Sequence, residues 1–152
     1  MTYIGVYEAA GLALIKESGV FVKKWRGSMS GRAWYKGKII AAPYPKTAKS
    51  FEVLAHEIGH IVANPNRKAP SWEREMLASE YALVQFKRFG LKLPRQIKTK
   101  AARYIAYSVC QALNRGMKKI PAMVRKYCRG RVVKVRCVRP NGDFVKYAYR
   151  AI

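Results

Sequence analysis

Acidic residues are scarce in this chain of 152 residues, where eight Asp and Glu face 31 Lys and Arg and the formal charge is +23. Long apolar runs are also lacking, because no stretch of 18 uncharged apolar residues occurs, and we therefore expect no membrane-spanning helix. The N-terminus lacks a basic region ahead of its apolar stretch, so we expect no secretion signal and a cytoplasmic protein. Half of the residues are nevertheless apolar, which excludes a disordered basic tail.

Cysteine and histidine are equally sparse. The three cysteines, Cys110, Cys128 and Cys137, have no C-x-x-C spacing, which argues against a cysteine-based metal site. Reduced thiols are the expectation for a cytoplasmic chain, and a bridge between Cys128 and Cys137 stays open at this level. The only two histidines lie within one pentapeptide, His56 to His60.

The few acids are not spread evenly. Residues 1–80 hold 12 basic and seven acidic side chains, whereas residues 81–152 hold 19 basic side chains and one acid, a net charge of +18. Five of the eight acids fall between Glu52 and Glu80. Acids favour the first turns of helices, which would explain part of this clustering. Because the chain excludes carboxylates nearly everywhere else, the cluster indicates a functional need for them in this segment.

Apolar periodicity predicts a mostly helical α+β domain. Helices are expected over residues 3–20, 47–63, 71–89, 94–115 and 121–128. Short strands on either side of Lys36-Gly37-Lys38 predict a hairpin, and residues 132–138 and 144–149 predict a second hairpin around a turn at 140–143. We expect one domain over residues 1–152, with a core at 1–93 and a basic helical and hairpin portion at 94–152.

The pentapeptide His56-Glu57-Ile58-Gly59-His60 is an H-E-x-x-H motif within the second predicted helix. Residues four apart share one helix face, so both imidazoles can bind a single Zn²⁺. Glu57 lies about 100° further round the helix, where it can accept a proton from a metal-bound water and act as the general base. The alternative is that both histidines only form hydrogen bonds in the core, but burying them there without a further role is costly.

At these residues the chain resembles the zincin metallopeptidases. The metzincin branch has a third His soon after the motif, and this chain has none. The remaining resemblance is to the gluzincins, in which a Glu on the following helix is the third zinc ligand. The resemblance therefore implies a zincin-like fold, a bound Zn²⁺ and hydrolysis of peptide bonds in a peptide or protein substrate.

The segment that follows the motif offers three acids for the third ligand, Glu73, Glu75 and Glu80. Small gluzincins have the pattern E-x-x-A followed by a small residue, which fits Glu75 and the small residues at 78, 79 and 82. Glu80 lies after nineteen intervening residues, the longer spacing of thermolysin-like enzymes. We expect the metal ligands His56, His60 and Glu75, with Glu80 and then Glu73 as alternatives.

The resemblance is specific over about residues 48–90 and is closest to small metallopeptidase-like proteins of phages and mobile elements, some of them related to the repressor-cleaving ImmA/IrrE type. It implies that an edge strand at Lys38–Pro43 pairs with the substrate. Ser79 stands where the family often has an acid that supports a zinc-bound His. A residue that stabilises the transition state is not singled out, with Tyr44, Tyr81 and Tyr104 among the options.

The basic half, residues 81–152, interleaves Lys and Arg with tyrosines, a pattern that suits phosphate contacts together with base stacking. DNA or RNA is therefore an expected partner, although no helix-turn-helix, RNP or KH motif is present. The main alternative to a peptidase is a non-catalytic nucleic-acid-binding protein on a zincin scaffold, and an acidic protein partner is a further alternative. The oligomeric state stays open.

Overall fold

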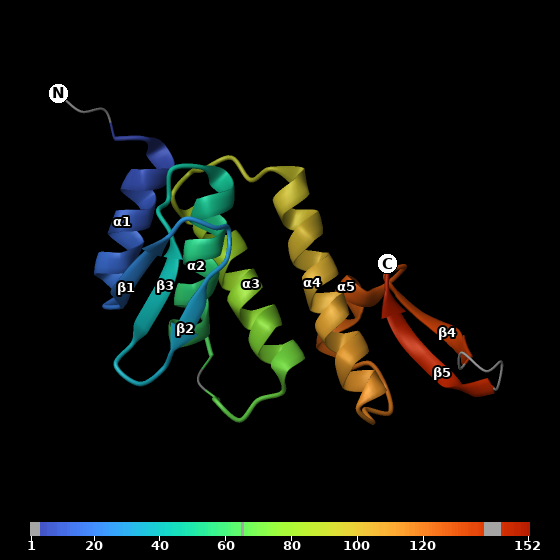
Figure 1. Ribbon diagram of the computed structural model, residues 1–152. Helices are drawn as coiled ribbons and strands as arrows, with labels where there is room; N and C mark the ends of the chain where they lie inside the picture. The colour runs from blue at the N-terminus through green and yellow to red at the C-terminus, as the bar shows by residue number, and fades with distance from the viewer. Residues whose placement is uncertain (1–3, 65, 139–143) are drawn as a thin grey trace. The chain divides into compact units, whose positions relative to one another are not determined.

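The computed structural model describes residues 4–64, 66–138 and 144–152, with side chains outside the description for residues 137–147 (Figure 1). Contacts between residues divide the chain into two compact units. The first comprises residues 1–69 and 77–98, and the second comprises residues 70–76 and 99–152. The expected α+β content is confirmed. No helix in the described residues is long and apolar enough to span a membrane.

The first unit contains α1 (Val6–Ser18), β1 (Phe21–Arg26), β2 (Arg32–Trp34), β3 (Ile39–Pro43), α2 (Ala48–Val62) and most of α3 (Ser71–Arg88). Its core is formed by apolar side chains of the three helices packed against one face of the sheet, which contributes Ile40 and Ala42. Phe51 and Phe86 meet edge to face at its centre, with ring centroids 5.0 Å apart. Five of the six ends of these helices lie within two residues of the expected bounds. The exception is the start of α1, which begins at Val6, three residues later than expected.

The three strands are ordered β1-β3-β2, with β3 parallel to β1 and antiparallel to β2. The hairpin expected around Lys36-Gly37-Lys38 is confirmed as β2 and β3. The expectation that Lys38–Pro43 forms an edge strand is wrong, because β3 has a neighbour on each side. The strand that covers it, Phe21–Arg26, was not anticipated because its cations interrupt the alternation of apolar and polar residues that marks a strand.

The second unit contains the greater part of α4 (Arg95–Asn114), a 3-10 turn η1 (Ala122–Val124), the short α5 (Arg125–Cys128), and the antiparallel hairpin of β4 (Val132–Val138) and β5 (Phe144–Ala151). Asn114 at the end of α4 fixes the hairpin, because its side chain donates to the carbonyl oxygen of Tyr149 at 3.0 Å and accepts from the Tyr149 amide at 2.9 Å. Both expected strands are confirmed, and the turn expected at 140–143 lies outside the described residues.

Two buried thiols lie in the second unit, Cys110 on α4 and Cys128 on α5, and both are free. The side chain of Cys137, considered above as a bridge partner for Cys128, lies outside the described residues. Burial, reinforced by the neighbouring Cys110 thiol, raises the pKa of Cys128 to about 11. Both thiols are consequently protonated and unreactive at neutral pH.

Candidate metal centre

The N-terminal capping box of α2 and its buried apolar face fix the orientation of the helix about its own axis. Thr47 and Ser50 form a capping box, in which the Ser50 amide donates to Thr47 Oγ1 at 3.2 Å and the Thr47 amide donates to Ser50 Oγ at 2.9 Å. Phe51, Leu54 and Ile58 are completely buried on the core side of the helix. This anchoring leaves the face with the two motif histidines half-buried rather than enclosed in the core.

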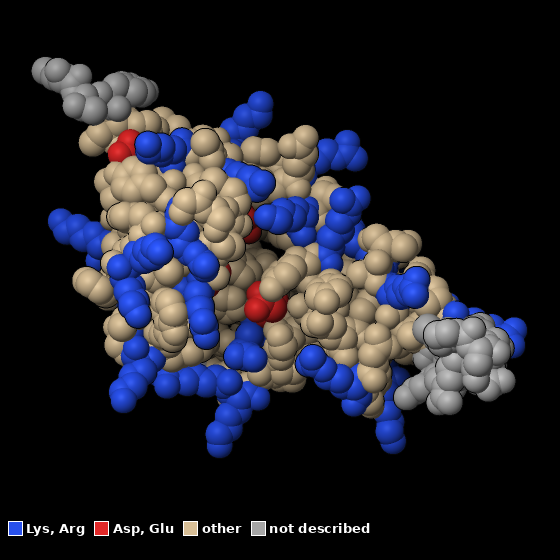
Figure 2. All heavy atoms as spheres, in the orientation of Figure 1, with Lys and Arg blue, Asp and Glu red and all other residues tan. Residues whose placement is uncertain are grey.

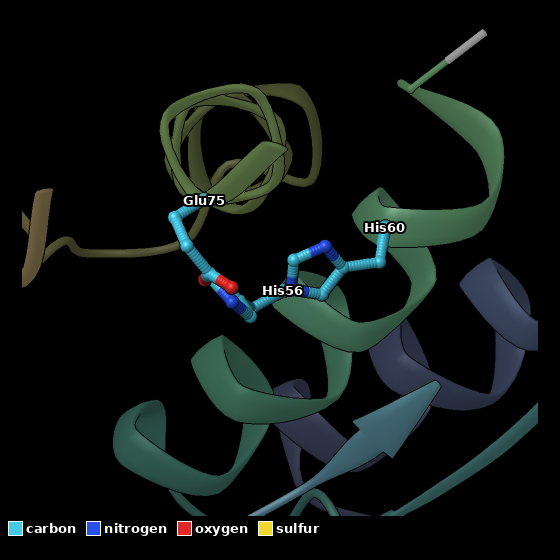
Figure 3. A group of neighbouring side chains, drawn as sticks. All are labelled: His56, His60 and Glu75. Carbon is cyan, nitrogen blue, oxygen red and sulfur yellow. The ribbon is translucent and has the colours of Figure 1, made fainter. Parts of the chain in front are cut away.

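His56, His60 and Glu75 come together in the structure (Figure 3). One ligand atom from each residue lies within 4.8 Å of the ligand atoms of the other two. The two imidazole rings lie nearly perpendicular, at 88°, with centroids 4.7 Å apart. Glu73 and Glu80, the alternatives for the third acid, lie outside this cluster. All three clustered side chains are half-buried, so solvent and solutes can reach them.

The distance between α2 and α3 is set by Gly59. A Cβ added at Gly59 would lie 2.9 Å from the carbonyl oxygen of Ala78 and 3.0 Å from its Cα, so the two helix backbones are in direct contact. Ala78 is completely buried at this contact. Glu75 precedes Ala78 by one turn of the same continuous helix, and the close contact therefore places its carboxylate beside the histidines.

Ser79 supports one of the histidines directly. Its Oγ lies 3.3 Å from Nδ1 of His56, and the serine is only 2% exposed. When Nδ1 carries the ring proton and donates it to Ser79, the Nε2 lone pair of His56 is the one presented to a metal. A neutral hydroxyl thus occupies the place at which the resemblance had suggested an acid.

Glu57 is not one of the three clustered groups and is only 8% exposed. The backbone at Gly31, just before β2, lies against its side chain, since a Cβ added at Gly31 would come within 2.6 Å of Oε1. Gly31 therefore leaves the space that the Glu57 carboxylate occupies. The sequence contained a weak signal for this position, a glycine in the Gly-Ser-Met-Ser-Gly stretch, but no pattern connected it to the motif.

The structure describes the surroundings of Tyr44 and Tyr81, two of the three tyrosines named above as options for stabilising the transition state. Tyr44 donates its hydroxyl hydrogen bond to Oε1 of Glu8 at 2.5 Å, and this bond raises the pKa of the phenol. Tyr81 packs its ring near Gly59, and burial raises the pKa of its phenol as well. Both phenols therefore keep their protons at neutral pH, and Tyr44 is already engaged with Glu8.

Comparison of the chain with protein-family models, curated proteins and solved structures finds no match. The geometry of the cluster and the chemistry of its residues are therefore the features that indicate a function.

Proposed function

We propose that this protein is a zinc-dependent metallopeptidase of the gluzincin type, with His56, His60 and Glu75 as the metal ligands. The observation that carries the proposal is the convergence of these three side chains within 4.8 Å. Two imidazoles and one carboxylate are a donor set that zinc uses in catalytic sites, and three protein ligands leave a coordination position for water or substrate. Zinc held there would lower the pKa of a coordinated water and polarise the scissile carbonyl.

Glu57 supplies the proton transfers in this proposal. It follows His56 directly on α2, and its low exposure keeps bulk water from competing for the carboxylate. Glu57 accepts a proton from the attacking water and later donates it to the nitrogen of the departing amine. Gly31 leaves room for the carboxylate at this position, because any larger side chain would occupy the same volume.

The geometry of the sheet favours a peptide substrate. Strand β2 is an edge of the sheet, and Gly31 immediately precedes it. A peptide that added to the free edge of β2 would gain main-chain hydrogen bonds and would pass near Glu57. The substrate-binding strand in this proposal is therefore Arg32–Trp34 instead of the central strand β3.

Zinc content and cleavage of an unfolded protein test the proposal together. We expect about one zinc per chain in the wild type, loss of zinc in Glu75→Ala, and retention of zinc in Glu80→Ala, a matched removal of an acid from the same helix. Glu57→Gln should keep its zinc and lose hydrolysis of fluorescently labelled casein. Undiminished cleavage by Glu57→Gln would contradict the mechanism, and full zinc content in Glu75→Ala would contradict the ligand set.

Non-catalytic binding of nucleic acid is the second candidate function, and the exposed face of α4 favours it. Lys100, Arg103, Tyr104 and Tyr107 are all exposed, at spacings that place them along one side of the helix. We propose that DNA or RNA contacts this stripe. Retardation of DNA or RNA in a gel that fades with added salt would support this function, and a metal-free purified protein would favour it over the peptidase.

A further inference from the structure

The outer face of the three-stranded sheet has an unusual composition. Pairing across the strands places Phe21, Ile39 and Trp34 in one row and Lys24, Ala41 and Arg32 in the next. The alternate residues of β3, Ile40 and Ala42, point to the opposite face and pack in the core. The outer face therefore presents one row with two aromatic rings beside a row with two cations, and we call it the outer sheet surface.

Of the two aromatic rings of this surface, Phe21 is exposed and Trp34 is partly exposed, with cations beside the Trp34 ring. Phe21 is 64% exposed, which is a high fraction for a large apolar side chain. The Trp34 ring has Lys23 Nζ 5.4 Å from its centroid and Arg32 Cζ 5.3 Å from it. Cation–π attraction holds both positive groups near one indole, although they repel each other. Lys23 and Arg32 are therefore held close to the sheet, where they can pair with the anionic groups of a partner.

No carboxylate of the surrounding segment offsets this charge. Between Glu17 and Glu52 the chain has eight Lys and Arg and no Asp or Glu. Figure 2 shows Lys and Arg side chains gathered over the strands of the first unit. Ordinary solvated surfaces intersperse charges of both signs, because a field of one sign opposes the compact state. A polyanion is the complement that would relieve this repulsion.

We propose that the outer sheet surface binds single-stranded nucleic acid. Unpaired bases stack on Phe21 and Trp34, and the phosphates pair with Lys23, Lys24 and Arg32. Sheets with exposed aromatic side chains suit single strands because the faces of unpaired bases are accessible, whereas the bases of a duplex are stacked on one another. An acidic protein would satisfy the cations but would leave the exposed Phe21 ring without a matching partner. This surface shares no residue with the stripe on α4 and includes none of the proposed zinc ligands.

Fluorescence anisotropy of a labelled twelve-residue oligothymidylate, titrated with the full chain, tests the proposal. Phe21→Ala should weaken binding about fivefold or more, with no change in salt dependence, because stacking is lost while the phosphate contacts remain. The double variant Lys24→Gln/Arg32→Gln should weaken binding and also reduce the slope of log K against log salt by about 1.4, the value for two lost phosphate contacts on a single strand.

Matched controls separate a specific surface from bulk charge. Lys16→Gln/Lys87→Gln removes two exposed cations from α1 and α3 of the same unit, and Val84→Ala removes an exposed apolar side chain from α3. Both controls should bind within twofold of wild type. Equal losses in the sheet variant and its charge control would overturn the proposal, as would equal affinity for a duplex of the same length.

Two further results would also overturn it. The first is competition by poly-glutamate as effective as that of unlabelled oligothymidylate, which would indicate an acidic protein partner. The second is wild-type binding that Lys100→Gln/Arg103→Gln abolishes and the sheet variants leave unchanged, which would assign the oligonucleotide to α4 alone.

Discussion

Gly59→Ala should destabilise the protein, although the same change stabilises most helix interiors. Alanine is ordinarily favoured over glycine inside a helix by about 1 kcal/mol. At Gly59 the new Cβ would lie 2.9 Å from a backbone oxygen and 3.0 Å from a backbone carbon of Ala78, and 3.1 Å from Tyr81 Cδ1. Relief would require α3 to move as a unit, and overpacking of this kind costs about 1–3 kcal/mol. We expect a net loss of about 1 kcal/mol in the free energy of unfolding.

Urea unfolding measures this change, and zinc competition against a chelator measures its effect on the proposed metal site. Zinc affinity should fall because a displaced α3 carries Glu75 away from His56 and His60. Gly27→Ala is the control, since a Cβ there has nothing within 4 Å and should be tolerated. Adding Ala78→Gly should not rescue the variant, because the crowded atoms of residue 78 are backbone. A Gly59→Ala protein that is as stable as wild type and binds zinc equally well would refute the reasoning.

Two further substitutions and one labelling experiment have defined outcomes. Gly31→Ala should lower casein hydrolysis at least tenfold while zinc content changes little, because the new Cβ would crowd Glu57 from Cγ to Oε1 and displace its carboxylate but touches none of the proposed ligands; unchanged hydrolysis would count against the role of Glu57. Ser79→Ala should weaken zinc binding about tenfold in chelator competition, since His56 loses the partner that orients its ring, whereas equal affinity would show that Ser79 contributes nothing. In the native protein at pH 8, iodoacetamide should leave Cys128 unmodified, with full modification after unfolding in guanidinium, as followed by mass spectrometry of peptides. Because folding raises the pKa of this thiol from 9.0 to about 11, its contribution to stability is complete below pH 9 and is lost as the pH rises toward 11; rapid labelling of the native thiol at pH 8 would contradict this pKa.

The helical part of the fold could be predicted because its signals are local. The apolar face of α2 and the stop at Asn64-Pro65 set its extent within one residue at each end, and Gly90 closes α3 with a positive φ of 65°. The placement of His56 and His60 on one face likewise follows from helical geometry alone. The approach of Glu75 could be anticipated only by resemblance, because it depends on how two helices pack.

The sheet and the groups around the motif could not be predicted because they depend on contacts between distant residues. The order β1-β3-β2 requires a parallel pairing across an intervening strand, and no local pattern specifies such a pairing. Gly31 lies 26 positions before Glu57, and its effect is visible only once the backbone passes the carboxylate. Ser79 departs from the family pattern already in the sequence, but its contact with His56 depends on how α2 and α3 pack.

The central position of β3 also constrains the order in which the first unit folds. The hairpin of β2 and β3 closes over only the short segment between Trp34 and Ile39, and hairpins of this kind form in about 1–10 μs. Strand β1 has no partner until β3 exists, and its parallel pairing must close a longer loop. Helix α2 begins five residues after β3 ends. The nascent chain must therefore extend through β3 before either outer strand can pair, so the sheet and the motif helix become available for folding almost together during synthesis.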